Sequence, residues 1–319
     1  MSRLDPDRVS LRVPATSANL GPAFDCAGLA LALHDVLDFA VVPSGLDVEI
    51  SGVGAGELPT DESHLVVRAF RAACDELGWT PSGLRLSATN AIPQGRGLGS
   101  SAAAVVAGAM AAWALCPDVE TIDLNAVLRL TTAMEGHPDN VAACLHGGVT
   151  LTSTREDGDI GAAVLEVHPE VLPVVLVPDA TLSTEVARGL LPDVVPHGDA
   201  AFNAARAALL VHALTGEPAS LLEATEDRLH QRQRAAAMPD TLALIDRLRA
   251  AGQAAVVSGA GPSVLVLARR TVRLADEEPG ASEVREITGL TPPGWRVLPL
   301  EVDRRGTRLT RPLREVSFS

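Results

Sequence analysis

The part of this chain best suited to chemistry is a glycine-rich run that ends in two serines, residues 93–103, PQGRGLGSSAA. The alanine-rich stretch after it has no proline until Pro117, which predicts a helix beginning at the serines. Glycine lets a backbone approach a ligand closely, and the free N–H groups and dipole at a helix start attract anions. The run therefore predicts a site for nucleotide phosphates, with a flexible loop before a core helix as the alternative. The residues expected to contact the nucleotide are Pro93, Gln94, Gly95, Arg96, Gly97, Leu98, Gly99, Ser100, Ser101, Ala102 and Ala103.

Two familiar phosphate-binding motifs do not fit this run. A Walker loop needs a lysine directly before its serine or threonine, whereas Gly99 occupies that position and all 26 basic residues of the chain are arginine. The GxGxxG spacing of dinucleotide-binding folds is missing, and no acidic residue ends a following strand to bind a ribose. A phosphate loop without lysine is the remaining interpretation.

Two further loops carry small and polar residues that could lie near the phosphates. Residues 14–25 contain Asn19 and Asp25, which can bind an ammonium or hydroxyl group, although both residue types also favour ordinary turns. Residues 258–263, SGAGPS, form a second glycine-rich turn between two expected strands, where a plain hairpin with bulges is the alternative.

The polar segment 135–140, EGHPDN, offers two carboxylates. Glu135 or Asp139 could bind Mg²⁺, which takes a few hard oxygen ligands beside phosphate oxygens. Asp139 or Asn140 could instead cap a helix beginning at residue 141. His137 has no cysteine or second histidine at ligand spacing, which argues against zinc.

Arginines near the third quarter of the chain suit a small carboxylate. Arg188 follows Ser183, a candidate helix cap, and Arg232 and Arg234 lie at the end of an expected helix. A guanidinium group binds a carboxylate in bidentate fashion, whereas ordinary solvated arginines are the alternative.

The elements that must position these residues follow from hydrophobic periodicity and turn signals. Strands are expected over residues 9–13, 36–42, 46–50, 84–88, 147–152, 164–167, 174–177 and 296–302, with a strand–turn–strand over 254–268. Helices are expected over residues 61–77, 100–115, 124–134, 199–214, 221–230 and 241–251. Because strands and helices mix without regular alternation, an α+β fold is favoured. The charged stretch 155–159 divides the chain into expected domains 1–155 and 156–319.

Composition excludes several classes of partner. The net charge of −14 argues against binding to nucleic acid or an anionic membrane surface. The four cysteines lie far apart with no CxxC pair, which is typical of a reducing compartment. The charged start of the chain has no apolar leader segment, so a cytoplasmic location is expected.

Together these segments closely resemble the GHMP kinases, and the homoserine kinase branch within them. The three sequence blocks of the family occur in order at residues 13–25, 93–103 and 257–263. The resemblance to the homoserine kinase branch depends on the first block and on residues 137–141 and 230–234. The resemblance implies a two-domain α+β fold, with a ribosomal-protein-S5-domain-2-like N-terminal domain and a ferredoxin-like C-terminal domain. It also implies ATP- and Mg²⁺-dependent phosphorylation of the side-chain hydroxyl of L-homoserine, a step toward threonine, by a cytoplasmic homodimer.

Residue roles are implied by the same resemblance. Ser100 and Glu135 would hold Mg²⁺, and Asp139, Asn140 and Arg188 would be catalytic. The residues implied to bind the substrate are Asn19, Asp25, His137, Asn140, Thr184, Arg188, Arg234, Gly259 and Gly261.

Several alternatives stay open on the sequence alone. Only one residue separates Glu135 from His137, whereas some relatives carry an insertion there, so Asp139 is the alternative metal ligand. Asp139 is also the one nearby carboxylate to consider as a base, because the lysine that many relatives use cannot occur here. Threonine, shikimate or pantoate could replace homoserine as the acceptor. A binding module without catalysis is a further alternative.

Overall fold

A computed structural model describes residues 5–270 and 278–312, and these residues form two β-sheets with helices packed on them. The larger sheet has the strand order β11-β1-β2-β4-β3, with β5 beside β2 and β6 beside β5. Its strands are β1 (Arg8–Ala18), β2 (Ala27–Val41), β3 (Gly45–Gly52), β4 (Gly83–Asn90), β5 (Val149–Thr154), β6 (Ile160–Leu165) and β11 (Arg308–Thr310). The smaller sheet has the order β10-β7-β9-β8. Its strands are β7 (Val171–Pro178), β8 (Ala255–Val257), β9 (Val264–Arg269) and β10 (Trp295–Pro299).

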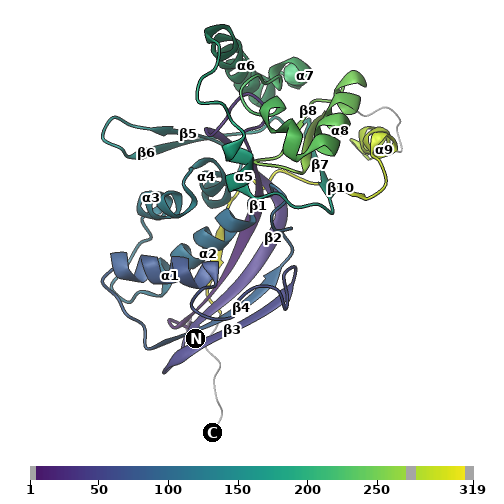
Figure 1. Cartoon of the computed structure of the whole chain (residues 1–319). Coiled ribbons are helices and arrows are strands. Elements are labelled where there is room, and N and C mark those ends of the chain that lie inside the picture. The colour runs from purple at the N-terminus through teal and green to yellow at the C-terminus, as the bar shows by residue number, and fades with distance from the viewer. Residues whose placement is uncertain (1–4, 271–277, 313–319) are drawn as a thin grey trace.

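Four helices cover one face of the larger sheet (Figure 1). They are α1 (Leu65–Glu76), α2 (Ser100–Leu115), α3 (Leu124–Glu135) and α4 (Asp139–His146). Helices α2 and α4 contact β1 directly, and α1 packs on α2. The strongly apolar sequence of α2 follows from this position, because a helix covered on all sides needs no polar face.

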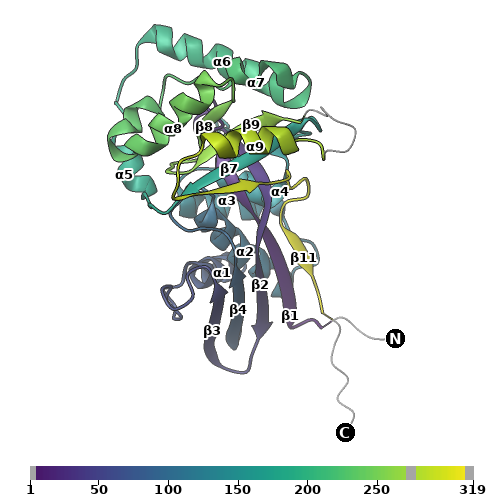
Figure 2. The same cartoon turned by 90° about the vertical axis from the view of Figure 1, so that its right-hand side faces the viewer.

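The remaining helices belong to the second half of the chain (Figure 2). They are α5 (Thr184–Gly189), α6 (His197–Thr215), α7 (Leu221–Ala224), α8 (Pro239–Ala250) and α9 (Ala281–Leu290), with a 3₁₀ turn at Arg232–Ala237. Helix α8 packs on β8 and β9, and α9 lies beside α8. Strand β7 is buried along its whole length, so the smaller sheet is covered on both faces at its centre.

The α+β expectation is confirmed, and the helix expected over 100–115 occurs as α2. The helix expected over 221–230 is wrong beyond Ala224. The Asp227 carboxylate accepts hydrogen bonds from the backbone N–H groups of Leu229, His230 and Gln231, which replaces helical bonding by a loop. Strand β11 was not expected, because three residues give no periodic signal.

The expected domain division at residue 155 stays a prediction. It falls in the turn of the hairpin between β5 and β6, and both strands belong to the larger sheet. The expectation that the chain has no apolar leader concerns in part residues 1–4, which lie outside the described residues. Residues 271–277 and 313–319 of the expected second domain also lie outside them.

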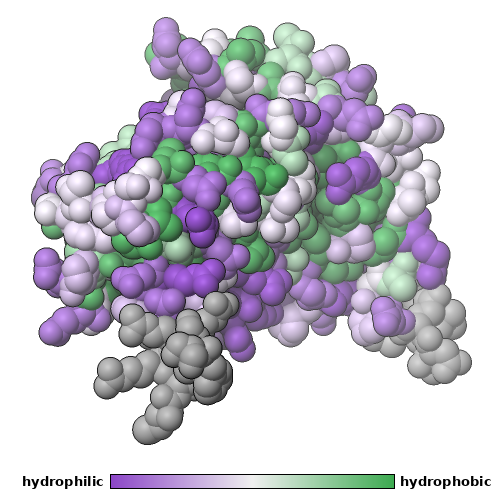
Figure 3. Space-filling model, turned by 90° about the horizontal axis from the view of Figure 1, so that it is seen from below, coloured by the Kyte–Doolittle hydropathy of each residue, from purple (hydrophilic) through white to green (hydrophobic). Residues whose placement is uncertain are grey.

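One face of the molecule carries both polar and apolar residues. On the face seen from below, hydrophilic residues dominate and apolar ones emerge between them (Figure 3). In the described part of the chain, no helix combines the length and apolar character needed to cross a bilayer.

Helices α1 and α2 cross closely at Gly108. A Cβ built on Gly108 would lie 2.3 Å from the carbonyl oxygen of Val66 and 2.8 Å from the backbone nitrogen of Phe70. The glycine that weakens the helix locally is therefore required by its packing. Gly289 in α9 is also helical, but nothing lies within 4 Å of its Cβ position.

We expect Gly108→Ala to destabilise the protein by about 1–3 kcal/mol, because the added methyl group pushes two helix backbones apart. Gly289→Ala should instead stabilise it by about 0.5–1 kcal/mol, since alanine is the better helix former. Urea unfolding of both variants tests the pair. Equal signs for the two changes would contradict this account of the helix crossing.

Asp303 holds the end of the chain against the larger sheet. Its buried carboxylate accepts hydrogen bonds from His34 on β2, from Arg308 on β11 and from the backbone N–H groups of Arg305 and Gly306. Burial alone would raise the pKa of Asp303, but these hydrogen bonds outweigh it and hold the pKa well below its usual range.

A depressed folded-state pKa means that the Asp303 carboxylate stabilises the fold above its unfolded pKa of about 3.9. We expect Asp303→Asn to lower the free energy of unfolding by about 2 kcal/mol at neutral pH. The difference from the wild type should shrink progressively as the pH falls below about 4 toward the folded-state pKa. Urea unfolding between pH 7 and pH 3 measures it, with the exposed Asp38→Asn as control. A difference that does not depend on pH would exclude this ionic contribution.

Candidate active site

A cavity of about 480 Å³ lies among the ends of β1, α2, α4 and α5 and the turn between β8 and β9. The predicted site residues that line it are Asn19, Asp25, Pro93, Gln94, Gly95, Gly97, Leu98, Gly99, Ser100, Ser101, Glu135, His137, Asp139, Asn140, Thr184, Arg188, Arg234, Gly259 and Gly261. Three predicted residues do not line it: Arg96, Ala102 and Ala103. Segments far apart in the sequence therefore meet at one cavity.

The glycine loop ends at the start of α2 in the manner of an anion site. Gly99 is the N-cap residue, with a left-handed φ of 66°, and no side chain caps the first turn. Ser100, Ser101 and Ala104 line the cavity, while Ala102 and Ala103 face the core. The uncapped N–H groups and the helix dipole at this end favour a negatively charged ligand.

The loop glycines are required by close contacts behind the loop. A Cβ on Gly97 would lie 2.1 Å from the carbonyl oxygen of Ser258, and one on Gly99 would lie 1.9 Å from the hydroxyl oxygen of Thr16. The Ser258 hydroxyl is 2.6 Å from the Gly97 carbonyl oxygen and donates to it, which ties the two glycine-rich turns together. The second turn is thus a brace for the first.

Arg96 braces the loop from the other side. Its guanidinium donates to the carbonyl oxygens of Pro178, Asp179 and Gln94, so its charge is directed at backbone rather than into the cavity. The expected contact of Arg96 with phosphate stays a prediction.

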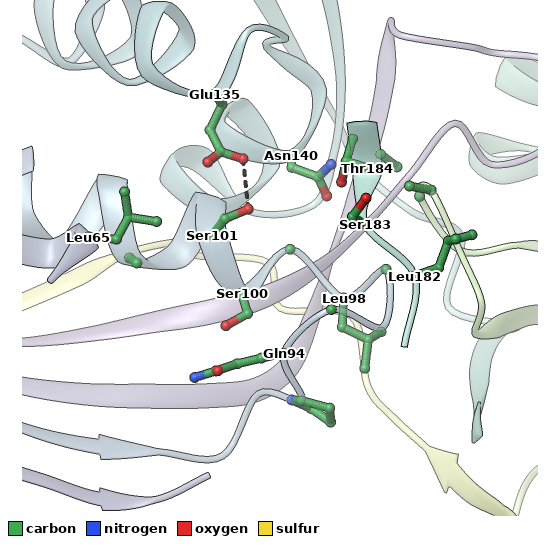
Figure 4. Close-up of a pocket in the computed structure, with 18 of the residues that line it drawn as sticks. Leu65, Gln94, Leu98, Ser100, Ser101, Glu135, Asn140, Leu182, Ser183 and Thr184 are labelled. Atoms are coloured by element: carbon green, nitrogen blue, oxygen red, sulfur yellow. Dashed lines mark hydrogen bonds between the residues drawn. The ribbon is translucent and has the colours of Figure 1, made fainter. Parts of the chain in front are cut away.

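Glu135 reaches the cavity beside the start of α2. One carboxylate oxygen accepts a hydrogen bond of 2.9 Å from the Ser101 hydroxyl, whereas Ser100 points toward Gln94 (Figure 4). Burial is the main cause of a raised pKa at Glu135. A second carboxylate that faces the same space, Asp139, adds to it.

Asp139 positions its neighbours. The buried carboxylate accepts hydrogen bonds on one oxygen from His137 at 2.7 Å, from the backbone N–H of Asn140 at 2.6 Å and from the Asn140 side chain. Burial opposes the charged imidazole, but the hydrogen bond and charge of Asp139 outweigh it and raise the pKa of His137. The Asn140 oxygen in turn accepts from Thr16. These contacts favour a positioning role for Asp139 over a role as base or metal ligand.

The loop before β2 places Asp25 by means of Asn19. The Asn19 side-chain oxygen accepts from the backbone N–H of Asp25, and its amide donates to the carbonyl oxygen of Gly259. Asn19, Leu20 and Asp25 all have positive φ, which Asn and Asp tolerate but which is unusual for leucine, so this loop is held in a special conformation. Asp25 then forms a bidentate ion pair with Arg188, at 2.7 and 2.8 Å.

Arg234 is only 2% exposed, yet no carboxylate among the described residues lies within ion-pair distance of it. It donates to the carbonyl oxygens of Ala187 and Gly259 and to the ring of His230. Burial is the main cause of its lowered pKa, followed by the charge of Arg188. A buried cation without a counter-ion at a cavity wall is suited to a ligand carboxylate.

The apolar end of the cavity was not expected from the sequence. Leu58, Pro59, Leu65 and Val66 line it beside the start of α1. No motif marks these residues, since they come from a loop and a helix start that the hydrophobic pattern assigns to packing.

Comparison with known families and proteins agrees with this arrangement. Residues 64–148 match the GHMP kinases N terminal domain, and residues 205–287 match the GHMP kinases C terminal domain. The homoserine kinase of Streptomyces avermitilis is 52% identical over 93% of this chain and 94% of its own length. That of Clavibacter michiganensis is 52% identical over 94% of this chain and 93% of its own length.

Solved structures give the same result. The crystal structure of homoserine kinase from Cytophaga hutchinsonii has a TM-score of 0.79 and 25% identity, covering 95% of this chain and 98% of that one. A putative homoserine kinase from Listeria monocytogenes has a TM-score of 0.75 and 30% identity, covering 95% and 99%. With two matched domains, a cavity built from all three glycine-rich and polar blocks, and relatives similar over nearly the whole length, the chain belongs to the GHMP kinase family.

Proposed function

We propose that this protein phosphorylates the side-chain hydroxyl of L-homoserine with ATP, giving O-phospho-L-homoserine on the route to threonine. Its relatives named homoserine kinase are similar to it over more than nine-tenths of its length. The observation that carries the proposal is the buried Arg234, which has no carboxylate partner among the described residues and lines the same cavity as the uncapped start of α2. An anion site for phosphates and a charged site for a small zwitterion share one cavity.

The nucleotide is proposed to lie along the glycine loop. Its phosphates would meet the N–H groups at the start of α2, near Ser100 and Ser101. Its base would fit the apolar end lined by Leu58, Leu65 and Val66.

Magnesium fits the oxygen donors near Glu135. Mg²⁺ needs few protein ligands when phosphate oxygens supply the rest, and one carboxylate with two serine hydroxyls meets that need. Asp139 is less suited, because one of its oxygens already accepts several hydrogen bonds. We therefore propose Glu135 with Ser100 as ligands. The ion would neutralise charge on the transferred phosphoryl group.

The amino acid is proposed to lie between the two arginines and Asp25. Arg188 and Arg234 would bind its carboxylate, with Thr184 assisting, and Asp25 would bind its ammonium group. Asn140 and His137 would hold the hydroxyl end, and backbone groups of Gly259 and Gly261 would close the site. Arg188 now pairs with Asp25, so a zwitterion can exchange this ion pair for two of its own.

Catalysis is proposed to rest on positioning. Phosphoryl transfer needs mostly alignment and charge stabilisation, so a strong base is dispensable. Asn140, held by Thr16 and Asp139, would align the attacking hydroxyl. Arg188 would stabilise developing charge, and Asp139 would act by holding Asn140 and His137. The cytoplasmic location and the homodimer stay predictions.

The first test measures ADP release with Mg-ATP and homoserine, threonine, shikimate, pantoate or mevalonate. We expect the highest kcat/KM with homoserine, because the site offers partners for both an ammonium and a carboxylate. Activity on mevalonate with none on homoserine would overturn the proposal.

Arg234→Leu tests the carboxylate site. Loss of a charge-assisted hydrogen bond should raise the KM for homoserine roughly 10- to 100-fold, with little change in the KM for ATP. Arg232→Leu is the matched control. Arg232 lies only two residues before Arg234, but it is exposed and forms an ion pair with Asp246. An unchanged kcat/KM in a folded Arg234→Leu protein would remove Arg234 from the site.

Glu135→Gln tests the metal site. Calorimetry measures the binding of ADP at varied Mg²⁺ concentration. We expect the affinity for Mg-ADP to fall at least roughly tenfold in this variant, and the affinity for ADP without Mg²⁺ to stay unchanged. Glu156→Gln, at an exposed position of the β5–β6 turn, is the control. If instead Asp139→Asn alone reduces the Mg²⁺ dependence, the metal ligand is Asp139.

A further inference from the structure

Phe24 lies against three charged or polar groups at the amino-acid end of the cavity. Its ring centroid is 5.8 Å from the guanidinium carbon of Arg188 and 5.5 Å from that of Arg234. The imidazole of His230 stacks on the same ring, with centroids 5.0 Å apart and an interplanar angle of 30°. One aromatic side chain thus contacts both arginines proposed to bind the substrate carboxylate.

Two guanidinium groups at one ligand site repel each other when the ligand is absent. The charge of Arg188 indeed contributes to the lowered pKa of Arg234. Asp25 offsets the charge of Arg188 through their ion pair. The negative face of an aromatic ring can stabilise both cations without using any of their N–H donors. A carboxylate in the position of the Phe24 ring would instead neutralise the two guanidinium groups and occupy the N–H donors that the substrate needs.

His230, which stacks on the Phe24 ring, is held in place by two hydrogen bonds. His230 is fully buried, and its Nε2 lies 2.7 Å from the carbonyl oxygen of Gly21, which can only accept. Nε2 therefore carries the proton, and Nδ1 is free to accept the hydrogen bond from Arg234. Burial lowers the pKa of His230, which keeps the ring neutral.

We propose that Phe24 is a positioning residue for substrate recognition: its ring holds the guanidinium groups of Arg188 and Arg234 together, so that both can bind one carboxylate. The inference rests on the proposed function. Phe24 does not line the cavity, so it acts through the two arginines and not on the substrate itself.

The experiment replaces Phe24 by leucine, by tyrosine and by 4-fluoro- and 3,4,5-trifluorophenylalanine. Fluorine weakens the negative ring face while the ring keeps its shape, so the series separates electrostatics from packing. We expect the KM for homoserine to rise roughly 5- to 30-fold in Phe24→Leu and by graded amounts along the fluorinated series. The KM for ATP should change less than twofold, and Phe24→Tyr should behave as the wild type.

The matched control is Phe202→Leu. Phe202 also lies against two arginines, with Arg206 at 4.6 Å and Arg228 at 3.7 Å from its centroid, but it is not part of this cavity. Its replacement should leave the KM for homoserine unchanged. A second readout uses 3-aminopropan-1-ol, which is homoserine without its carboxylate; the Phe24 changes should leave its KM unchanged while they raise the KM for homoserine.

The outcomes are distinct. If the wild type does not phosphorylate homoserine, the proposed function fails. If the wild type is active but fluorination leaves the KM for homoserine unchanged, or raises the KM values for homoserine and ATP equally, the inference about Phe24 is wrong. The fluorinated proteins decide the matter even if Phe24→Leu does not fold.

Discussion

The cavity depends on one backbone contact, the approach of the glycine loop to the turn between β8 and β9. Gly97 lies so close to Ser258 that no side chain fits between them. The hydroxyl of Ser258 also binds Ser17 at the end of β1, so three segments are locked at one point. Because the loop is held from behind, its N–H groups can face the cavity without a ligand to order them. The proposed anion site therefore needs no ligand to give the loop its shape.

The second organising constraint is electrostatic. A chain with a net charge of −14 keeps two arginines at one end of its main cavity, and only Arg188 has a carboxylate partner among the described residues. Leaving Arg234 buried and unpaired costs stability. That cost is recovered when an anionic group binds, so the site favours ligands that carry a carboxylate. Arginine suits this task better than lysine, because its planar donors bind a carboxylate and stack on a ring at once.

Local motifs were predictable from the sequence, and distant partners were not. The run 93–103 and the helix after it depend on neighbouring residues, so their types and spacing were sufficient. The contacts of Arg96 with Pro178 and of Asn19 with Gly259 join residues about 80 and 240 positions apart, and no spacing rule encodes them. Most of the predicted site residues line one cavity, and their roles stay predictions. Which of them bind a ligand and which brace the loop required the fold.

Strand β11 gives the fold a property that concerns its synthesis. Residues 308–310 pair with residues 10–12 of β1, and Asp303 fastens this return to β2. On the ribosome, β1 is made about 300 residues before its partner β11. This edge of the larger sheet can be paired only after residues 308–310 have been made. Closing a loop over this separation makes the pairing of β1 with β11 one of the entropically costlier contacts of the sheet to form.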